Sequence, residues 1–266
     1  MTPITDKEFT LFQRFIYDEA GISLSTAKKA LVCGRLSKRV ELHRLRNFTE
    51  YFRLLSEGSA AQEMQIAIDL LTTNETYFFR EPRHFEVLKE LAMEARGRAQ
   101  PFRVWSAACS SGEEPYSIAM VLASTLQNTP FEVLGSDISS RVLERARTGH
   151  YPASRTTHIP KPYLHQFCLR GHGDQDGTVL VDKPLRERVR FLQVNLNEAL
   201  PALGQFDCIF LRNVMIYFNA QTKRTVVERV ASLLKPGGHL MIGHSETLNE
   251  ITSVVVQRAP SLYCKP

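Results

Sequence analysis

The N-terminal part of the chain places apolar side chains at helical spacing. Phe9, Phe12 and Ile16 recur every three or four positions, and the run stops at Gly21, a residue type that commonly ends helices. Two capping boxes predict the starts of later helices: Asn47 with Glu50, and Ser59 with Gln62. Together these signals predict a small N-terminal helical domain over residues 1–72.

From residue 101 onward, short apolar segments alternate with helical ones, which is typical of a parallel sheet covered by helices. The predicted strands are Arg103–Ala107, Glu132–Gly135, Val189–Val194, Asp207–Leu211 and His239–Gly243. The tail from Ser253 to Cys264 predicts two further strands that pair antiparallel at an edge of the sheet. We therefore expect a linker and connecting helix over residues 73–100, followed by an α/β domain over residues 101–266.

One connection is too long for a simple helix-to-strand link. Residues 151–188 contain a GHGDQDG turn over Gly171–Gly177 and a strand-like TVLVD segment over Thr178–Asp182. A disordered excursion is the alternative, but the apolar residues along the segment argue against it. We expect a small inserted antiparallel β-subdomain.

The composition argues against several classes of protein but does not indicate a function. The chain has 266 residues, of which 43% are apolar and 23% charged, as in soluble globular proteins. Its five cysteines form no CxxC pair and its eight histidines no HExxH motif, so we expect no disulfide framework and no metal site. The start of the chain does not look like a signal peptide, and no apolar run approaches the roughly 20 residues of a membrane-spanning helix. We expect a cytoplasmic protein without membrane insertion.

The first predicted strand-to-helix turn suggests a ligand site. Ligands of open parallel sheets bind at the carboxyl ends of strands, and this turn runs from Ala107 to Gly112. It has neither GxGxxG nor a lysine after the glycine, which excludes a phosphate-binding P-loop. Glu113 and Glu114 then open the helix, where carboxylates repel phosphate. Equally, the two glutamates could simply interact with the helix dipole.

The second predicted strand favours a ligand. It ends at Ser136 and Asp137, about 25 residues downstream, where doubly wound folds place the acid that binds ribose hydroxyls. Asp137 could instead cap the next helix. A carboxylate there, with a phosphate-averse first turn, fits a phosphate-free nucleoside such as S-adenosylmethionine. Asn195 and Leu196 end the third strand, where an amide could contact adenine. The Leu233–Gly243 run resembles the helix, Pro-Gly-Gly turn and fifth strand of methyltransferases.

The predicted fourth strand, within Phe206–Phe218, is where methyltransferases place acceptor chemistry. Adenine-methylating enzymes would show an Asn/Asp-Pro-Pro-aromatic motif there, and cytosine-methylating enzymes a Pro-Cys nucleophile. This chain has neither, since it reads RNVMIY over Arg212–Tyr217. Methylation of nucleic acid is therefore disfavoured, although an RNA or DNA methyltransferase and a non-catalytic adaptor remain as alternatives.

Five segments together resemble the bacterial chemotaxis protein methyltransferase family: TTNETYFFRE (Thr72–Glu81), WSAACSSGEEPYSIA (Trp105–Ala119), SDIS (Ser136–Ser139), LRNVMIYF (Leu211–Phe218) and GHSE (Gly243–Glu246). The resemblance covers essentially the whole chain. It implies methylation of glutamate side chains on chemoreceptors, with S-adenosyl-L-methionine as methyl donor and S-adenosyl-L-homocysteine as product. It also implies an α/β fold, with a Rossmann-like class I methyltransferase sheet, an N-terminal helical bundle and the inserted β-subdomain.

The resemblance carries over to individual positions. The cofactor-binding residues that it implies, together with two residues of the first turn, are Asn74, Thr76, Arg80, Ala108, Gly112, Glu114, Asp137, Asn195, Leu196, Arg212 and Asn213. On the acceptor side it implies Arg80 and Tyr217 as catalytic residues. A glutamate is ionised at neutral pH, so it needs placement and desolvation rather than a general base. Without the resemblance, Arg80 would be read as an ion-pair partner of Glu81 and Tyr217 as a core aromatic.

A basic segment suggests how the partner binds. If Ser25–Arg46 is one helix, four basic residues lie along one stripe, which could face an acidic receptor helix or plain solvent: Lys28, Arg35, Arg39 and Arg46. Gly34 inside this helix weakens the prediction. In some family members the inserted subdomain binds a C-terminal receptor peptide by adding a strand, and the Gly171–Gly177 turn resembles theirs. We expect a monomer that is recruited to membrane receptor clusters and does not bind nucleic acid.

Overall fold

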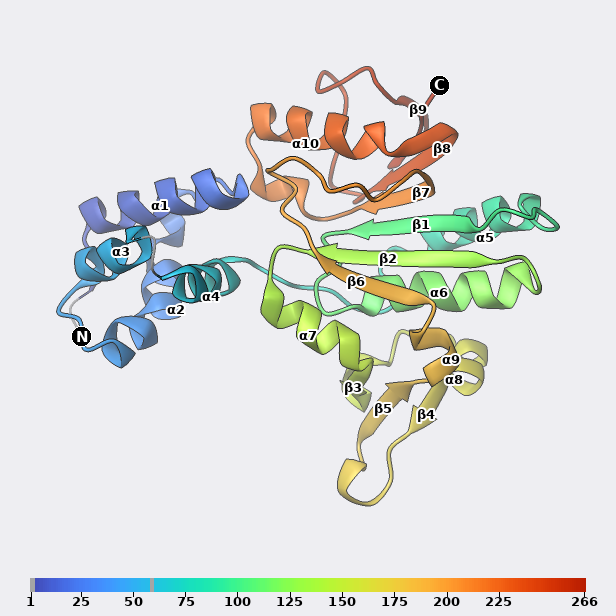
Figure 1. Ribbon diagram of the computed structural model, residues 1–266, viewed down its shortest axis with the longest axis horizontal. Helices are drawn as coiled ribbons and strands as arrows, with labels where there is room; N and C mark the ends of the chain where they lie inside the picture. The colour runs from blue at the N-terminus through green and yellow to red at the C-terminus, as the bar shows by residue number, and fades with distance from the viewer. Residues whose placement is uncertain (1–2, 58–59) are drawn as a thin grey trace.

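The computed structural model describes residues 3–57 and 60–266 (Figure 1). The described residues of the helical domain form four α-helices: α1 (Asp6–Ala20), α2 (Lys29–Leu42), α3 (Phe48–Ser56) and α4 (Ala61–Leu71). Helix α1 ends at Gly21, whose φ of 70° suits glycine, so the predicted stop is confirmed. Asn47 accepts the Glu50 N–H as predicted, but the Glu50 carboxylate accepts from Arg46 N instead of closing the box. Ser59 of the second predicted box lies outside the described residues.

The prediction of one helix over Ser25–Arg46 is wrong. A 3₁₀ turn covers Thr26–Lys28, and α2 then runs only to Leu42. Arg44 adopts a left-handed φ of 54°, which ends the helical path and carries the chain toward α3. Arg46 therefore lies beyond the helix, and the predicted basic stripe does not exist as a continuous row.

The α/β domain is built on a seven-stranded sheet of order β6-β2-β1-β7-β8-β10-β9. The strands are β1 (Phe102–Ala107), β2 (Phe131–Asp137), β6 (Val189–Gln193), β7 (Phe206–Leu211), β8 (Leu234–Ile242), β9 (Val256–Ala259) and β10 (Leu262–Cys264). The first five are parallel, and β10 runs antiparallel to both of its neighbours. This is the sheet of class I methyltransferases, so the predicted fold class is confirmed.

Successive strand residues point to opposite faces of this sheet and enter two separate cores. Trp105 and Ile209 belong to the core that also takes in α10 (Ala220–Ser232) and the helical domain. Val104 and Cys208 belong to the core formed with α5 (Arg83–Glu94) and α6 (Glu113–Leu126). The helix predicted within residues 73–100 is α5, and it packs directly against α6.

The predicted Pro-Gly-Gly turn before the fifth strand differs from the structure. Strand β8 starts at Leu234 and continues through this segment to Ile242. The pairing of β7 with β8 changes register at this point: Phe206 pairs with Leu234, and Cys208 pairs with His239. Gly237 has a φ of 72°, so the glycine accommodates a bulge within the strand rather than a turn before it.

The insertion forms a second, three-stranded antiparallel sheet of order β3-β5-β4, as predicted. Its strands are β3 (His150–Pro152), β4 (Cys168–Arg170) and β5 (Thr178–Val181), and it carries the short helices α8 (Lys161–Phe167) and α9 (Lys183–Arg186). It follows α7 (Ser140–Thr148) and projects from the end of the domain opposite β9 (Figure 1). The Gly171–Gly177 turn lies at its far tip.

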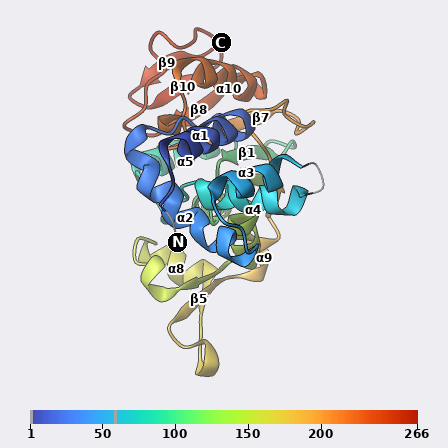
Figure 2. The ribbon, with the colours of Figure 1, turned by 90° about the vertical axis from the view of Figure 1, so that its left-hand side faces the viewer.

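Figure 1 shows the helical domain next to the ends of the parallel strands that carry the arrowheads, and in Figure 2 the helical domain lies in front of the sheet. The carboxyl ends of the strands therefore face the helical domain, and the two domains meet where an α/β sheet binds ligands. Among the described residues, no helix is both long and apolar enough to cross a membrane.

Candidate functional site

A pocket that is partly open to solvent lies at the carboxyl ends of β1, β2 and β7, with about 870 Å³ of empty space when the adjoining open solvent is included. The strand order reverses beside β1, which is where open α/β sheets bind ligands. Its walls come from the α/β domain, from the connection after α4, and from Ala20 and Ile22 at the end of α1. The pocket is therefore shared by both domains.

All but one of the predicted cofactor-binding residues line this pocket: Asn74, Thr76, Arg80, Ala108, Glu114, Asp137, Asn195, Leu196, Arg212 and Asn213. The exception is Gly112. Its φ is 95°, and an added Cβ would lie 2.9 Å from both the Ala146 Cβ and the Tyr151 hydroxyl. Gly112 thus allows α7 and the inserted subdomain to approach the first turn, which is a packing role that the motif did not reveal.

Three charged residues form an ion-pair cluster that we call the floor: Glu81, Glu114 and Arg212. Arg212 and Glu114 line the pocket, and Glu81 pairs with Arg212 without lining it. The Arg212 side chain is 1% exposed and lies 3.2 Å from each carboxylate. Burial raises the pKa of Glu114, and Arg212 opposes that shift. Burial acts on Glu81 in the same direction, but Arg212 and donors from His244 and Asn213 outweigh it, so the Glu81 pKa is lowered.

The two acids of the GEEP segment have different roles. Glu114 accepts a hydrogen bond from the Ser106 hydroxyl at 2.7 Å and lines the pocket. Glu113 is fully buried and accepts from the Arg155 guanidinium at 2.9 Å, which ties α6 to the inserted subdomain. Neither acid is a free cap at the helix N-terminus, so the simple dipole interpretation does not describe them.

Asp137 and Ile138 form one side of the pocket, which we call the Asp137 wall. The Asp137 carboxylate accepts the backbone N–H groups of Ser110 at 2.8 Å and Ser139 at 2.9 Å. It therefore joins the first turn to the start of α7, and each oxygen retains a further lone pair. Burial is the main cause that raises the pKa of Asp137, to about 6.

Asn195 reaches the pocket with its side chain already engaged. Its amide donates to the Glu19 carbonyl and to the Glu198 carboxylate, and its side-chain oxygen accepts from Asn197 N. These bonds tie the end of α1 to the loop after β6. The side-chain amide is thus committed to holding the two domains together.

Arg80 and Tyr217 are half-buried and line the part of the pocket that we call the mouth. Arg80 donates to the Glu75 carbonyl at 3.2 Å and lies 5.7 Å from the centre of the Tyr77 ring. Within residues 3–57 and 60–266, its guanidinium has no carboxylate within ion-pair distance, and Glu81 is paired with Arg212 instead. Tyr217 packs partly on the core and also lines the pocket, so the core-aromatic interpretation is incomplete.

Buried polar atoms without a hydrogen-bond partner among the described residues indicate which ligand groups the pocket can bind. Asn74 Nδ2 and Arg212 Nε are buried without a hydrogen-bond partner among the described residues. A carboxylate of a bound molecule would satisfy such donors, and the Asp137 oxygens would satisfy hydroxyl groups. The pocket therefore fits a ligand with an amino-acid end and a ribose end, as S-adenosylmethionine has.

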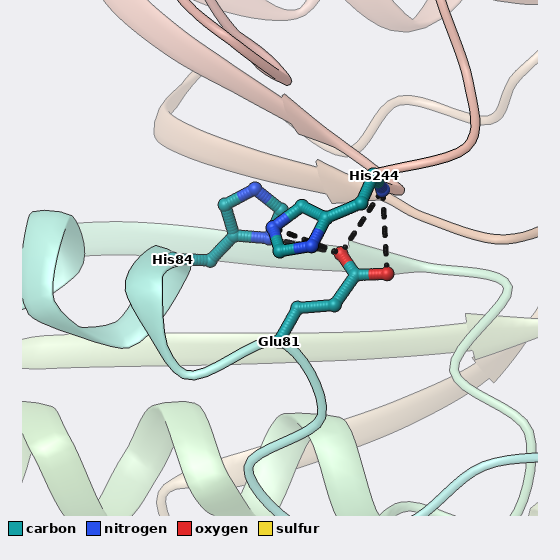
Figure 3. Close-up of side chains that lie close together, drawn as sticks. All are labelled: Glu81, His84 and His244. Carbon is teal, nitrogen blue, oxygen red and sulfur yellow. Dashed lines mark hydrogen bonds and ion pairs between the residues drawn. The ribbon is translucent and has the colours of Figure 1, made fainter.

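Glu81, His84 and His244 offer ligand atoms within 4.8 Å of one another, which is close enough for a metal ion (Figure 3). Arg212 pairs with the same Glu81 carboxylate, and its positive charge opposes a second cation there. His84 is buried, its Nε2 lies 2.7 Å from the Ser261 hydroxyl, and burial lowers its pKa to about 4. We interpret the cluster as a support beneath the floor, and the sequence-based expectation of no metal stands as a prediction.

Sequence reasoning did not identify Glu246 as a site residue. Its buried carboxylate accepts the backbone N–H groups of Asn213, Met215 and Gly243 at 2.7–2.9 Å. It thereby fixes the loop between β7 and Tyr217, in which Asn213 has a positive φ of 57°. The GHSE segment contained this residue, but no local pattern indicates that its partners lie thirty residues earlier.

The predicted receptor-binding residues do not share one surface. Arg35 donates to the carbonyls of Leu71 and Thr72, and Arg39 pairs with the buried Glu63 carboxylate. Lys28 and Arg46 are exposed. Two of the four basic residues thus hold the helical domain together, and two face solvent.

Comparison with known proteins gives a consistent result. Residues 74–261 match the family described as CheR methyltransferase, SAM binding domain, and residues 7–72 match CheR methyltransferase, all-alpha domain. Chemotaxis protein methyltransferase 2 of Pseudomonas aeruginosa is 42% identical, over 97% of this chain and 93% of that protein. The chemotaxis protein methyltransferase of Escherichia coli is 40% identical, over 98% of this chain and 91% of that protein.

Proposed function

Because the chain belongs to the CheR chemotaxis protein methyltransferase family, we infer that its shared pocket is where a chemoreceptor glutamate meets the methyl donor. The protein is an S-adenosylmethionine-dependent protein-glutamate O-methyltransferase of chemoreceptors. What we propose is the assignment of residues within the pocket. One observation carries it: the Arg212–Glu114 ion pair lines the same pocket as Arg80, which has no carboxylate partner among the described residues.

The floor and the Asp137 wall would hold the methyl donor. Asn74 and Arg212 have free donors for its amino-acid carboxylate, and Glu114 supplies a negative charge for its ammonium group. Asp137 has acceptor capacity for ribose hydroxyls. When bound, S-adenosylmethionine supplies an electrophilic methyl group carried on a sulfonium.

The mouth would hold the acceptor. Arg80 has no carboxylate partner among the described residues, so its guanidinium is available to bind an ionised glutamate in a fixed plane. Tyr217 can donate to one carboxylate oxygen and leave the other free to react. No general base is needed, because the acceptor is ionised at neutral pH. These residues act by orienting the acceptor and excluding water.

Receptor recognition would involve two more surfaces. Lys28 and Arg46 of the helical domain are exposed, and we propose that each contacts acidic side chains of a receptor helix. The inserted sheet has β3 and β4 as its edge strands, and Leu169 on β4 is exposed, so a receptor tail could add a strand there. We propose that the protein works on the cytoplasmic side of the membrane, at receptor clusters.

Methyl transfer to receptor-containing membranes tests the assignment. With labelled S-adenosylmethionine, the wild-type protein should label the receptor band, and mild base should release the label because carboxyl methyl esters hydrolyse. Base-stable label would point to another acceptor group and refute transfer to glutamate. Arg80→Ala should label far more slowly while still binding S-adenosylhomocysteine, and unchanged labelling would remove Arg80 from the proposed acceptor site.

A further inference from the structure

Helix α7 begins without a cap from its own sequence. Ser139 occupies its N-cap position with extended φ and ψ of −81° and 113°, as N-cap residues do. Yet the Ser139 hydroxyl is buried and has no hydrogen-bond partner among the described residues. The first N–H groups of α7 must therefore be satisfied from elsewhere.

The cap comes from the other domain. Asp69, on α4, is 5% exposed. One of its carboxylate oxygens accepts Ser140 N at 3.0 Å, and the other accepts the Ser140 hydroxyl at 2.9 Å and Arg141 N at 3.3 Å. A carboxylate at a helix N-terminus is also favoured by the helix dipole. Helix α4 contacts α7, and Figure 1 shows it next to the start of α7.

A second residue of α4 continues the contact toward the pocket. Gln65, one turn before Asp69, donates to the Ile138 carbonyl at 3.0 Å and to the Asp69 carboxylate at 2.8 Å. Gln193, just at the end of β6, donates to the same Ile138 carbonyl and to Gln65. Ile138 belongs to the Asp137 wall, so bonds from α4 end directly on the pocket lining.

We propose that Asp69 is a positioning residue for cofactor binding: it caps α7 from the helical domain and thereby holds the Asp137 wall in its binding geometry. This inference rests on the proposed function, in which Asp137 contacts the cofactor. The same carboxylate fixes Ser140 and Arg141 on one side and Gln65 on the other. Without the Asp69 carboxylate, the start of α7 loses its cap. The Asp137 wall, which directly precedes α7, then loses this contact with α4.

One consequence distinguishes positioning from general stabilisation. Removing Asp69 should raise KM for S-adenosylmethionine and leave kcat at saturating cofactor unchanged, because Arg80 and Tyr217 lie elsewhere in the pocket. A merely structural residue would lower the amount of active enzyme and leave KM unaltered.

The test is calorimetric titration of the full-length protein with S-adenosylhomocysteine. Asp69→Ala should weaken binding about tenfold, whereas Asp69→Asn, which keeps a capping oxygen, should stay within about threefold of wild type. Asn47→Ala is the matched control, since it removes the side-chain cap of α3, a helix that contributes no residue to the pocket lining. It should lower the denaturation midpoint but leave the affinity unchanged.

Several outcomes decide the matter. Wild-type affinity in Asp69→Ala, or equal weakening in Asn47→Ala, would overturn the proposal. If Asp69→Ala does not fold, Gln65→Ala replaces it: severalfold weaker binding supports the proposal, and wild-type affinity overturns it. Failure of the wild-type protein itself to bind S-adenosylhomocysteine would instead refute the proposed function, so the two failures are distinguishable.

Discussion

The floor and the mouth belong to the same pocket but differ in ion pairing: the charges at the floor are paired with one another, and the charge at the mouth has no carboxylate partner among the described residues. At the floor, Arg212 is buried between Glu81 and Glu114, and each charge faces one of opposite sign. At the mouth, Arg80 is half-buried and has no carboxylate partner among the described residues. One pocket thus contains a compensated region and an uncompensated one.

The difference indicates what each region is for. Buried charges that are paired within the protein are costly to separate and fix the positions of their neighbours. A charged side chain that lines a pocket without a partner is available to a bound molecule. The free-energy cost of partly burying that charge is offset only when the molecule binds. We therefore expect changes at the floor to affect folding and cofactor binding first, and changes at the mouth to affect turnover.

Arg212→Met should break the floor and give the largest effect. Both carboxylates, whose side chains are only 13% and 14% exposed, would lose their cation, which should lower the free energy of unfolding by about 3 kcal/mol. Urea denaturation followed by circular dichroism measures the loss. Arg83→Met is the control, because the Arg83–Glu86 pair is exposed and should contribute less than about 1 kcal/mol. Equal losses in the two variants would contradict the compensated floor.

Tyr217→Phe should affect the mouth alone. Removing the hydroxyl leaves the ring and its packing, so turnover should fall on the order of 10²-fold through lost acceptor placement. S-Adenosylhomocysteine affinity should stay within about twofold, since the floor and the Asp137 wall are intact. Rates at saturating cofactor and calorimetry on the same preparation separate the two effects. A loss of affinity equal to the loss of turnover would contradict the division into two regions.

Asp137 differs from both the floor and the mouth, because it is buried like Arg212 but has no ion-pair partner among the described residues. Burial raises its pKa to about 6, and bound ribose hydroxyls would favour the ionised form. S-Adenosylhomocysteine affinity should therefore rise from pH 5 to pH 7, by up to about tenfold per pH unit below the pKa. Asp137→Asn should bind weakly with a flatter profile. An identical slope in this variant would assign the titration to another group.

Lys28→Ala should give the smallest effect. Lys28 is exposed, so the free energy of unfolding should not change measurably. The KM for receptor should rise about two- to threefold, and the difference from wild type should shrink as salt screens the charge. Receptor methylation at two ionic strengths measures this. A constant difference at both would argue that Lys28 does not meet an acidic partner.

Much of the fold followed from periodicity. Helical spacing identified the first domain, and alternation of strands and helices identified the sheet, because each pattern reports one buried face. The inserted sheet was recognised from the length of a connection. The strand through Pro236 and the early end of α2 were not recognised, since both depend on a positive φ, at Gly237 and Arg44. Gly237 N bonds to the distant Lys265 carbonyl, whereas a non-glycine residue, Arg44, ends α2 through local bonds to Glu41.

Within the site, the residues of the family motifs converged on one pocket, but their mutual contacts could not be read from the sequence. Asn195 was expected to face a ligand, and its side chain instead holds α1. Gly112 was expected at the cofactor and provides space for Tyr151. Asp69 and Glu246 act on backbone groups distant in sequence, and no local spacing identifies such partners.

The attachment of the inserted sheet bears on how new specificities could be engineered. Tyr151 donates to the Ser111 carbonyl at 2.8 Å, and Arg155 neutralises the buried Glu113, so the insertion is anchored on the same turn that leads into the pocket. A chimera that grafts another family member's insertion should therefore carry a tyrosine and an arginine at these two positions. A graft without them would leave a buried acid unneutralised and disturb catalysis before any new tail peptide could be tested.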